Sequence, residues 1–245
     1  MRPRGALRVL MLFVSVSSCK TMNADDSHLS AAEDDAPVVC MDTENAGLNL
    51  GNAQVRKAKK RAGDAFVLSK QCQEAARREF QALATRTQFV CSCVYISAQA
   101  DRFSKSHVDK NLAPGKRGDQ IECLRHIFWQ SHLSCQWGAN AAQTMGDVRE
   151  EKSEPLSDAA RLDRERDQYH NTYGRRFMES YQMQHGYDLS LAACHKVSGD
   201  IARYAVRQGH CGHFGKTDGS RQLIRIDEGQ ITSSAKTFSM KKVHL

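Results

Sequence analysis

The chain has 245 residues, of which 40% are hydrophobic and 26% are charged, and its formal net charge is +7. Three of the positive charges, Arg2, Arg4 and Arg8, fall in a predicted leader, so about +4 (7 minus 3) remains, which is too small an excess to predict nucleic-acid binding. Roughly 200 residues follow a polar N-terminal stretch, enough for one domain with a well-buried core.

The first residues, MRPRGALRVLMLFVSVSSC, resemble the leader of a bacterial lipoprotein. The apolar run from Val9 to Val16 is shorter than the ~20 residues that span a bilayer, so a cleaved signal peptide over 1–18 is predicted. The letters VSSC, which end at Cys19, match the pattern at which such proteins are cleaved and lipidated. The resemblance implies a lipid anchor on Cys19 and a place in the bacterial cell envelope, on the periplasmic face or at the outer membrane, with the membrane as a partner. An ordinary secretory signal is the alternative.

The next segment, residues 19–51, is polar and acidic, which predicts a flexible tether. Strong helix formers then predict a helix over about 52–83. The letters RKAKKR from Arg56 indicate a solvated helix face, with anionic headgroups or cell-wall polymers as the alternative contact. The letters TQFVCSCVYIS from Thr87 fit either a buried strand or a buried helix end.

Capping signals predict the central helices. Asp119, with Glu122 three residues later, indicates a capping box and a helix that ends at Trp137 before Gly138. A second helix is expected over 140–150.

The later helices are marked in the same way. Ser157 is the predicted N-cap of a long helix to about Gln184, which Gly186 ends. Asp188 is the predicted cap of a further helix closed by Gly209.

The C-terminal part is expected to contain a Gly-rich loop over 209–220, one short strand or hairpin within 221–232, and a basic tail over 236–245. The predicted fold is therefore mainly α: one helical, disulfide-linked domain over 52–235 with a short β-hairpin near the C-terminus.

The cysteines fit an exported chain. Beyond Cys19 their number is even, as is typical where disulfides form: Cys40, Cys72, Cys91, Cys93, Cys123, Cys135, Cys194 and Cys211. Within one helix Cys123 and Cys135 would lie about 18 Å apart, too far to pair. Cys194 is predicted to pair with Cys211, and the alternative is a zinc site that adds the neighbouring histidines: His195, His210 and His213.

The stretch from Leu124, LRHIFWQSHLSCQWG, is apolar nearly all round a helical wheel, which is typical of a central buried helix. It nevertheless contains Arg125, His126 and His132. An unpaired charge costs at least a few kcal/mol to bury, so these groups need partners.

The helix from Ser157 offers the partners, because one of its faces is apolar at both ends and polar in the middle. The polar middle contains Asp163, Asp167, His170, Asn171 and Gly174. Gly174 costs about 1 kcal/mol in a helix interior, and its missing side chain suits close approach by a neighbouring helix. We expect Arg125 and His126 or His132 to meet Asp163, Asp167 and Asn171 there.

The order of these residues resembles a bacterial domain family that occurs in exported or toxin-like proteins and has no assigned activity. Its pattern is R-H-x-x-W, G-x-x-x-A, G-D-x-x-E and D-x-x-x-N-x-x-G-R, and the matching residues are Arg125, His126 and Trp129; Gly138 and Ala142; Gly146, Asp147 and Glu150; Asp167, Asn171, Gly174 and Arg175. Two positions depart from it: Arg149 stands where the family commonly has His, and His170 where it commonly has Asn.

Two functions follow from this cluster. In the first, the protein is a hydrolase, His126 is a general base oriented by Asp167 or Glu150, and Arg125 and Asn171 stabilise negative charge on an ester, amide or phosphate. Asp147 completes the set of candidate catalytic residues. No cofactor is specified, and a divalent metal on His126, Asp167 and His170 is a variant of this hypothesis.

In the second, the protein is a non-catalytic envelope scaffold or binding lipoprotein, and the cluster is a structural ion-pair network that joins two helices. The substrate or protein partner is not specified by either hypothesis. A pocket that opens onto His126 would favour chemistry, and a sealed cluster would favour packing.

Overall fold

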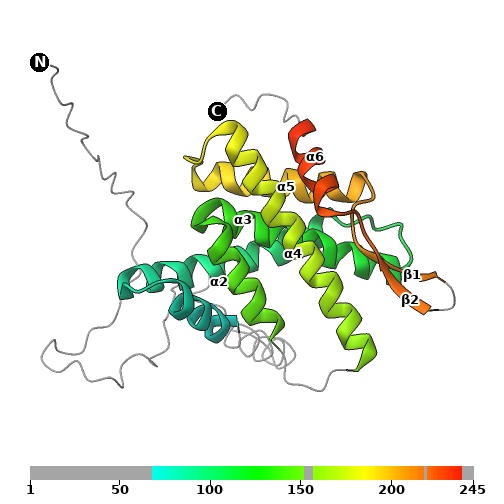
Figure 1. The fold of residues 1–245 in the computed structure, drawn as a ribbon, viewed down its shortest axis with the longest axis horizontal. Helices are drawn as coiled ribbons and strands as arrows, with labels where there is room; N and C mark the ends of the chain where they lie inside the picture. The colour runs from blue at the N-terminus through cyan, green and yellow to red at the C-terminus, as the bar shows by residue number, and fades with distance from the viewer. Residues whose placement is uncertain (1–67, 152–156, 218–219, 239–245) are drawn as a thin grey trace, which may run out of the picture. The chain divides into compact units, whose positions relative to one another are not determined.

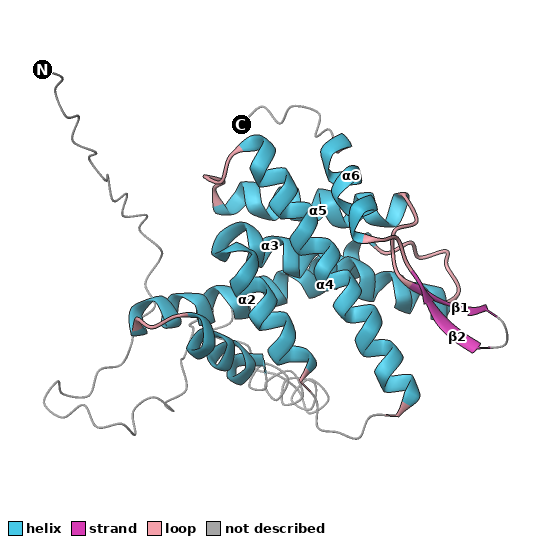
Figure 2. Cartoon of the chain, viewed as in Figure 1, coloured by secondary structure: helices cyan, strands magenta, loops and turns pink. Residues whose placement is uncertain are grey.

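The computed structural model describes residues 68–151, 157–217 and 220–238, all of which belong to the compact unit Asn49–Leu245. The predictions for the signal peptide, Cys19 and the tether lie outside these residues. Residues 68–79 are helical, and the further elements are α2 (Leu83–His107), α3 (Pro114–Glu150), α4 (Asp158–His185), α5 (Leu191–Arg207), β1 (His213–Thr217), β2 (Ser220–Ile224) and α6 (Glu228–Thr237). Helices dominate the described chain (Figure 2), so the mainly α prediction is confirmed. None of the described helices is long and apolar enough to cross a bilayer.

Helix α3 is the centre of the domain and contacts α2, α4 and α5 (Figure 1). Its aromatic segment is buried on all sides, as the sequence predicted, and its largest apolar side chains are at most 2% exposed: Leu124, Ile127, Phe128, Trp129 and Leu133. A helix in this position must bury the polar side chains in its sequence, so each of them needs a hydrogen-bond or ion-pair partner within the fold.

The start of α3 differs from the prediction. The helix begins at Pro114 after the N-cap Ala113, five residues before Asp119. Proline fits the first helical turn because its missing N–H would have had no partner there. The predicted break at Gly138 is confirmed, since this residue has a non-helical backbone (φ 85°) between two helical segments.

The ends of α4 agree with the prediction. The Ser157 hydroxyl accepts a hydrogen bond from the N–H of Ala160 at 3.2 Å, and Gly186 (φ 96°) follows the last residue. Ser190, rather than Asp188, caps α5. Gly209 (φ 69°) lies just past the end of α5, as expected.

The C-terminal elements are shifted relative to the prediction. The hairpin pairs β1 with β2, with Phe214 opposite Leu223, so the expected loop over 209–220 is wrong in its second half. Most of the expected strand region after residue 227 is instead α6. Asp227 and Gln230 form its capping box, a local signal that outweighs the β-branched residues that follow.

The segment from Thr87 lies within α2 and is helical. Its buried residues Phe89, Val90, Cys93 and Ile96 recur at helical spacing, which places them on one face against the core. The alternative of a buried strand is therefore wrong.

Three disulfides join the described elements: Cys72–Cys93, Cys123–Cys211 and Cys135–Cys194. Cys91 is disulfide-bonded as well. Cys123 and Cys135 do not pair with each other, as expected. The predicted Cys194–Cys211 bridge is wrong, because each of these cysteines reaches a different turn of α3. The alternative, a zinc site that uses Cys194 and Cys211, is wrong as well, because both sulfurs are in disulfides and neither is a free thiolate.

Candidate functional site

The site lies where α3 and α4 touch. The hydroxyl of Ser131 donates a hydrogen bond to the carbonyl oxygen of Gly174 at 3.1 Å, so the two backbones approach closely at this point. The close approach that Gly174 predicted is confirmed. Two turns N-terminal to Gly174 on α4, the polar middle of the helix lies against the first half of α3.

His126 is the buried centre of the site, with 1% of its surface exposed. Its Nδ1 lies 2.9 Å from Oδ1 of Asn171, which is itself buried. Because an amide oxygen only accepts hydrogen bonds, this contact places a proton on Nδ1, so Nε2 is the nitrogen that carries the lone pair in the neutral form of the ring. Asn171 therefore sets both the orientation of the ring and its tautomer.

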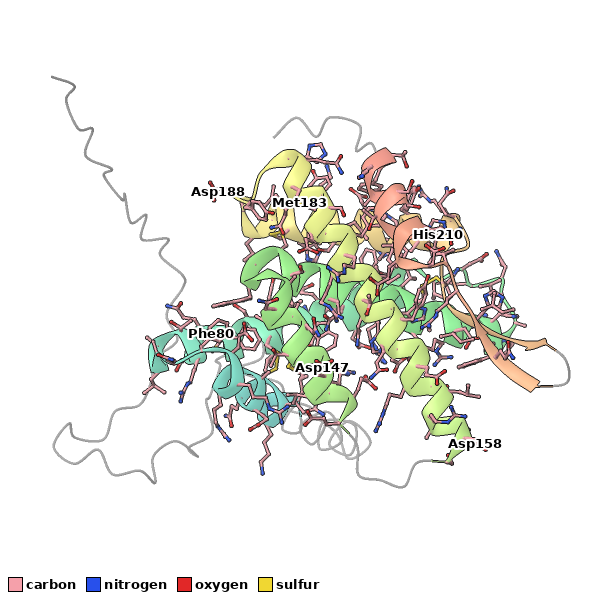
Figure 3. The ribbon with its side chains drawn as sticks, viewed as in Figure 1. Phe80, Asp147, Asp158, Met183, Asp188 and His210 are labelled. Atoms are coloured by element: carbon pink, nitrogen blue, oxygen red, sulfur yellow. A yellow bond between two sulfur atoms is a disulfide. The ribbon has the colours of Figure 1, made fainter. Side chains whose placement is uncertain are left out.

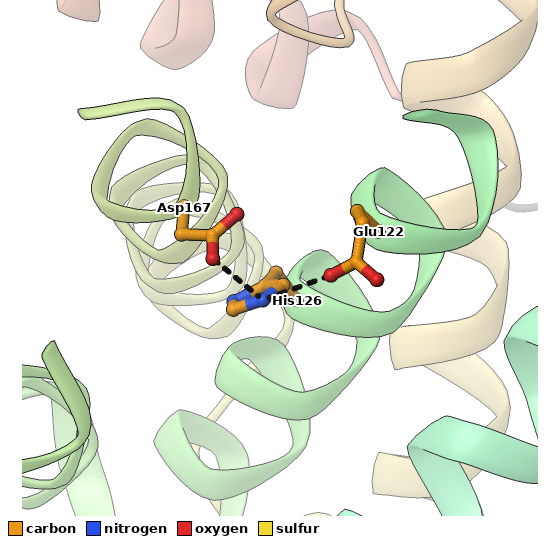
Figure 4. Close-up of side chains that lie close together, drawn as sticks. All are labelled: Glu122, His126 and Asp167. Atoms are coloured by element: carbon orange, nitrogen blue, oxygen red, sulfur yellow. Dashed lines mark ion pairs between the residues drawn. The ribbon is translucent and has the colours of Figure 1, made fainter. Parts of the chain in front are cut away.

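Two carboxylates flank the other ring nitrogen. Nε2 of His126 lies 3.6 Å from Oε2 of Glu122 and 3.5 Å from Oδ2 of Asp167 (Figure 4). Glu122 precedes His126 by one helical turn on α3, and Asp167 precedes Asn171 by one turn on α4, so the same local spacing on two facing helices builds the cluster. The side chains of Glu122 and Asp167 are 27% and 16% exposed, so they connect the buried imidazole with the surface.

Arg125 and Arg166 add positive charge around these carboxylates. Arg125 contacts Oε2 of Glu122 through Nη2, which also lies 3.4 Å from Nε2 of His126. Arg166 donates a hydrogen bond to Asp119 at 2.9 Å, and its Nε lies 3.8 Å from Oδ1 of Asp167.

The predicted ion pair between Arg125 and Asp167 is therefore wrong. Arg125 pairs with Glu122 of its own helix, while Asp167 contacts His126 and Arg166. Asp163, a further expected partner, has a side chain that is 58% exposed and lies 3.5 Å from Arg166.

A third guanidinium, that of Arg149, lies 4.8 Å above the ring of Trp129. The Trp129 ring in turn meets the His126 ring edge to face, with 6.2 Å between their centroids. Burial and the charge of Arg125 lower the pKa of Arg149, whereas the charges of Glu150, Asp167 and Glu122 oppose this shift. Arg149 has no ion pair with any residue in the described ranges.

The acidity of Glu122 reflects its surroundings. Burial raises the pKa of the Glu122 carboxyl. The contact with His126 and the charges of Arg125, His126 and Arg166 outweigh burial and lower this pKa to about 2. At neutral pH, Glu122 is therefore a carboxylate.

The remaining predicted residues lie apart from this centre. Asp147, labelled in Figure 3, is exposed on the segment of α3 after Gly138 and interacts electrostatically with Arg175. Glu150 is 4% exposed and lies within electrostatic reach of Arg149.

His170 is fully buried, and its Nε2 accepts a hydrogen bond from the N–H of Gly212 at 3.0 Å. Burial lowers its pKa well below the usual range, so the ring is neutral. The structure does not bring His170 to His126 and Asp167 as the predicted ligand set requires: the potential ligand atoms that lie within 4.8 Å of one another belong to Glu122, His126 and Asp167.

Sequence reasoning missed the role of Glu122 because its position three residues after Asp119 suggested a capping partner. Its position four residues before His126 is the signal that could have identified it, since residues at this spacing share a helix face. Arg149 and Arg166 were missed for a different reason: arginine at such positions is usually solvated.

Two surface hollows of the described chain lie elsewhere. One is between the start of α4 and β2, and the other is beside Gly138. Neither of these two hollows is lined by His126.

Comparisons of the chain with protein-family models, with curated proteins and with solved structures give no match. The resemblance to the bacterial domain family therefore stays a prediction.

Proposed function

We propose that the protein is an exported, lipid-anchored hydrolase of the bacterial envelope that cleaves an anionic ester, specifically a phosphoester. The observation that supports it is the position of Nε2 of buried His126, whose ring is held by Asn171 and which is flanked by the carboxylates of Glu122 and Asp167. An oriented imidazole nitrogen next to carboxylates is a common means of activating water.

The arginines favour a negatively charged substrate. Arg166 already has carboxylate partners, but Arg149 rests on Trp129 without one among the described residues. A desolvated guanidinium without an anion is costly, and phosphate oxygens would satisfy it with two parallel hydrogen bonds. In the reaction, Nε2 of His126 accepts a proton from a water molecule, whose oxygen bonds to phosphorus as the ester bond breaks. The leaving alkoxide takes a proton from solvent, and His126 returns its extra proton to solvent.

A substrate panel tests this proposal. The purified protein would be assayed with bis(p-nitrophenyl) phosphate, p-nitrophenyl phosphate, p-nitrophenyl acetate and a peptide p-nitroanilide. We expect turnover of a phosphoester, a loss of at least ~100-fold in kcat/KM for His126→Gln, and a raised KM for Arg149→Met. Exposed His185 supplies the matched control, His185→Gln, which should retain wild-type rates.

The scaffold function is the second candidate, because neither of the two hollows described above is lined by His126. It predicts no turnover of any substrate in the panel, together with a lower melting temperature for His126→Gln. Hydrolysis that is lost in His126→Gln at an unchanged melting temperature would exclude it.

A further inference from the structure

We infer that Glu122, His126 and Asp167 form a binding site for one divalent transition-metal ion, with Zn²⁺ as the best-matched cation. This inference deepens the proposed hydrolytic function, because the cation would be the group that activates water. The three residues offer one nitrogen and two carboxylate oxygens within 4.8 Å of one another (Figure 4).

The distances favour ligands over hydrogen-bond partners. Nε2 of His126 lies 3.6 Å and 3.5 Å from the two carboxylate oxygens, whereas an N–H···O hydrogen bond spans about 2.7–3.2 Å. Two ligand atoms about 2.1 Å from a tetrahedral Zn²⁺ are separated by roughly 3.4 Å. Both nitrogen–oxygen separations are close to this value. To complete the set, the oxygens of Glu122 and Asp167, which lie within 4.8 Å of each other, must move closer together, and Arg125 must release Glu122.

The orientation of His126 provides a second argument. Its ring is 1% exposed, and the contact between Nδ1 and Asn171 turns Nε2 toward the carboxylates of Glu122 and Asp167. Metal-bound histidines almost always donate their other N–H to an oxygen acceptor, which is the role that Asn171 has here.

The ligand types narrow the choice of metal. An imidazole nitrogen with two carboxylates suits Zn²⁺ or Mn²⁺, whereas Mg²⁺ and Ca²⁺ prefer oxygen ligands alone. Three protein ligands leave a coordination position for water, as in catalytic zinc sites. The cysteines of the three described disulfides are not available as competing thiolate ligands.

Arg125 is the group that opposes a cation most directly, since its Nη2 contacts the same Glu122 oxygen that faces His126. If a metal ion binds there, the guanidinium must give up this contact and becomes free to meet the substrate. Arg125→Gln should therefore bind Zn²⁺ at least as tightly as the wild type, although it removes an ion pair.

Isothermal titration calorimetry with ZnCl₂ on purified, EDTA-dialysed protein tests the inference. We expect one Zn²⁺ per chain, with affinity reduced at least ~10-fold in His126→Gln and in Asp167→Asn, and ~10–100-fold in Asn171→Leu. The controls His170→Gln and His185→Gln should bind as the wild type does, and MgCl₂ should give no comparable binding. Circular dichroism of each metal-free variant verifies folding.

Three results would overturn the inference. The wild type could bind Zn²⁺ no more tightly than His126→Gln, Asp167→Asn could bind it as tightly as the wild type, or Arg125→Gln could bind it more weakly than the wild type. The outcomes for metal and function are separable. Hydrolysis by the EDTA-dialysed protein, lost in His126→Gln, would leave the proposed function standing and remove the metal. Site-specific Zn²⁺ binding without turnover of any substrate would support the metal site and contradict the proposed hydrolytic function.

Discussion

Gly174 of α4 lies directly against the backbone of Ile127 in α3: a Cβ atom at position 174 would be 2.7 Å from the Ile127 carbonyl oxygen. Real Cβ atoms essentially never come so close to a heavy atom of a residue to which they are not linked along the chain. The absence of a side chain at this one position lets the two helices meet, and it thereby brings the carboxylate of Asp167 within reach of His126.

Gly174→Ala should destabilise the protein by about 1–3 kcal/mol, because overpacking outweighs the gain of up to about 1 kcal/mol in helix propensity. Gly118→Ala is the matched control, since Gly118 lies in α3 with no atom within 4 Å of the new Cβ, and it should be neutral or stabilising. Urea unfolding followed by circular dichroism measures both. Equal stability of Gly174→Ala and the wild type would mean that the helices are not in backbone contact.

His170 is predicted to hold the base of the hairpin rather than a metal. His170→Leu leaves the buried N–H of Gly212 without its acceptor, which costs about 1–3 kcal/mol. His170→Gln keeps an acceptor and should lose less. Hydrogen exchange of the Gly212 amide should accelerate in the leucine variant and much less in the glutamine variant. The interpretation fails if the two variants are equally stable and equally protected.

His132 should make the fold sensitive to acid. It is fully buried, and burial together with the charge of His195 lowers its pKa to about 3, against about 6.5 in the unfolded chain. As the pH falls from 6.5 toward 3, the unfolded state binds a proton that the folded state does not bind. The free energy of unfolding therefore falls by about 1.4 kcal/mol per pH unit. Above pH 6.5 this contribution is constant.

Urea unfolding at pH 7 and at pH 5 measures the effect. His132→Gln removes the titrating ring and should reduce the loss of stability between these pH values by about 2 kcal/mol. The exposed control His185→Gln should lose as much stability as the wild type. An unchanged loss in His132→Gln would show that His132 becomes protonated within the fold.

The Cys123–Cys211 disulfide should contribute more stability than the Cys72–Cys93 disulfide. Their sequence separations are 88 and 21 residues, and the chain-entropy estimate for loops of these lengths is about 4.6 and about 3.3 kcal/mol. Urea unfolding of the two double alanine variants measures the difference. A larger loss for Cys72→Ala/Cys93→Ala would show that local packing, rather than loop length, determines their contributions.

Local signals made much of the fold predictable. The helix from Ser157 to about Gly186, the break at Gly138 and the burial of α3 on all sides follow from caps, glycine conformations and apolar spacing, which act within a few residues. The meeting of two polar patches at Gly174 was also predictable, since buried charge requires a partner and an interior glycine permits close approach.

The partners within that patch were not predictable. The patch contains two carboxylates that could pair with Arg125: Glu122 on the same helix and Asp167 on the facing helix. The geometry of the helices decides that Arg125 pairs with Glu122. The same holds for the cysteines: Cys211 pairs with Cys123 because tertiary packing brings their Cα atoms to 5.8 Å, a distance that spacing along the chain does not encode.

The amino-acid sequence by itself determined which residues had to be buried together, because the penalty for an unpaired charge and the periodicity of a helix are properties of the chain. Only the tertiary structure decided that Glu122, rather than His170, joins His126 and Asp167. The physical reason is that the contact between two helices is set by their relative rotation and translation, and a shift of one turn exchanges every neighbour across the interface.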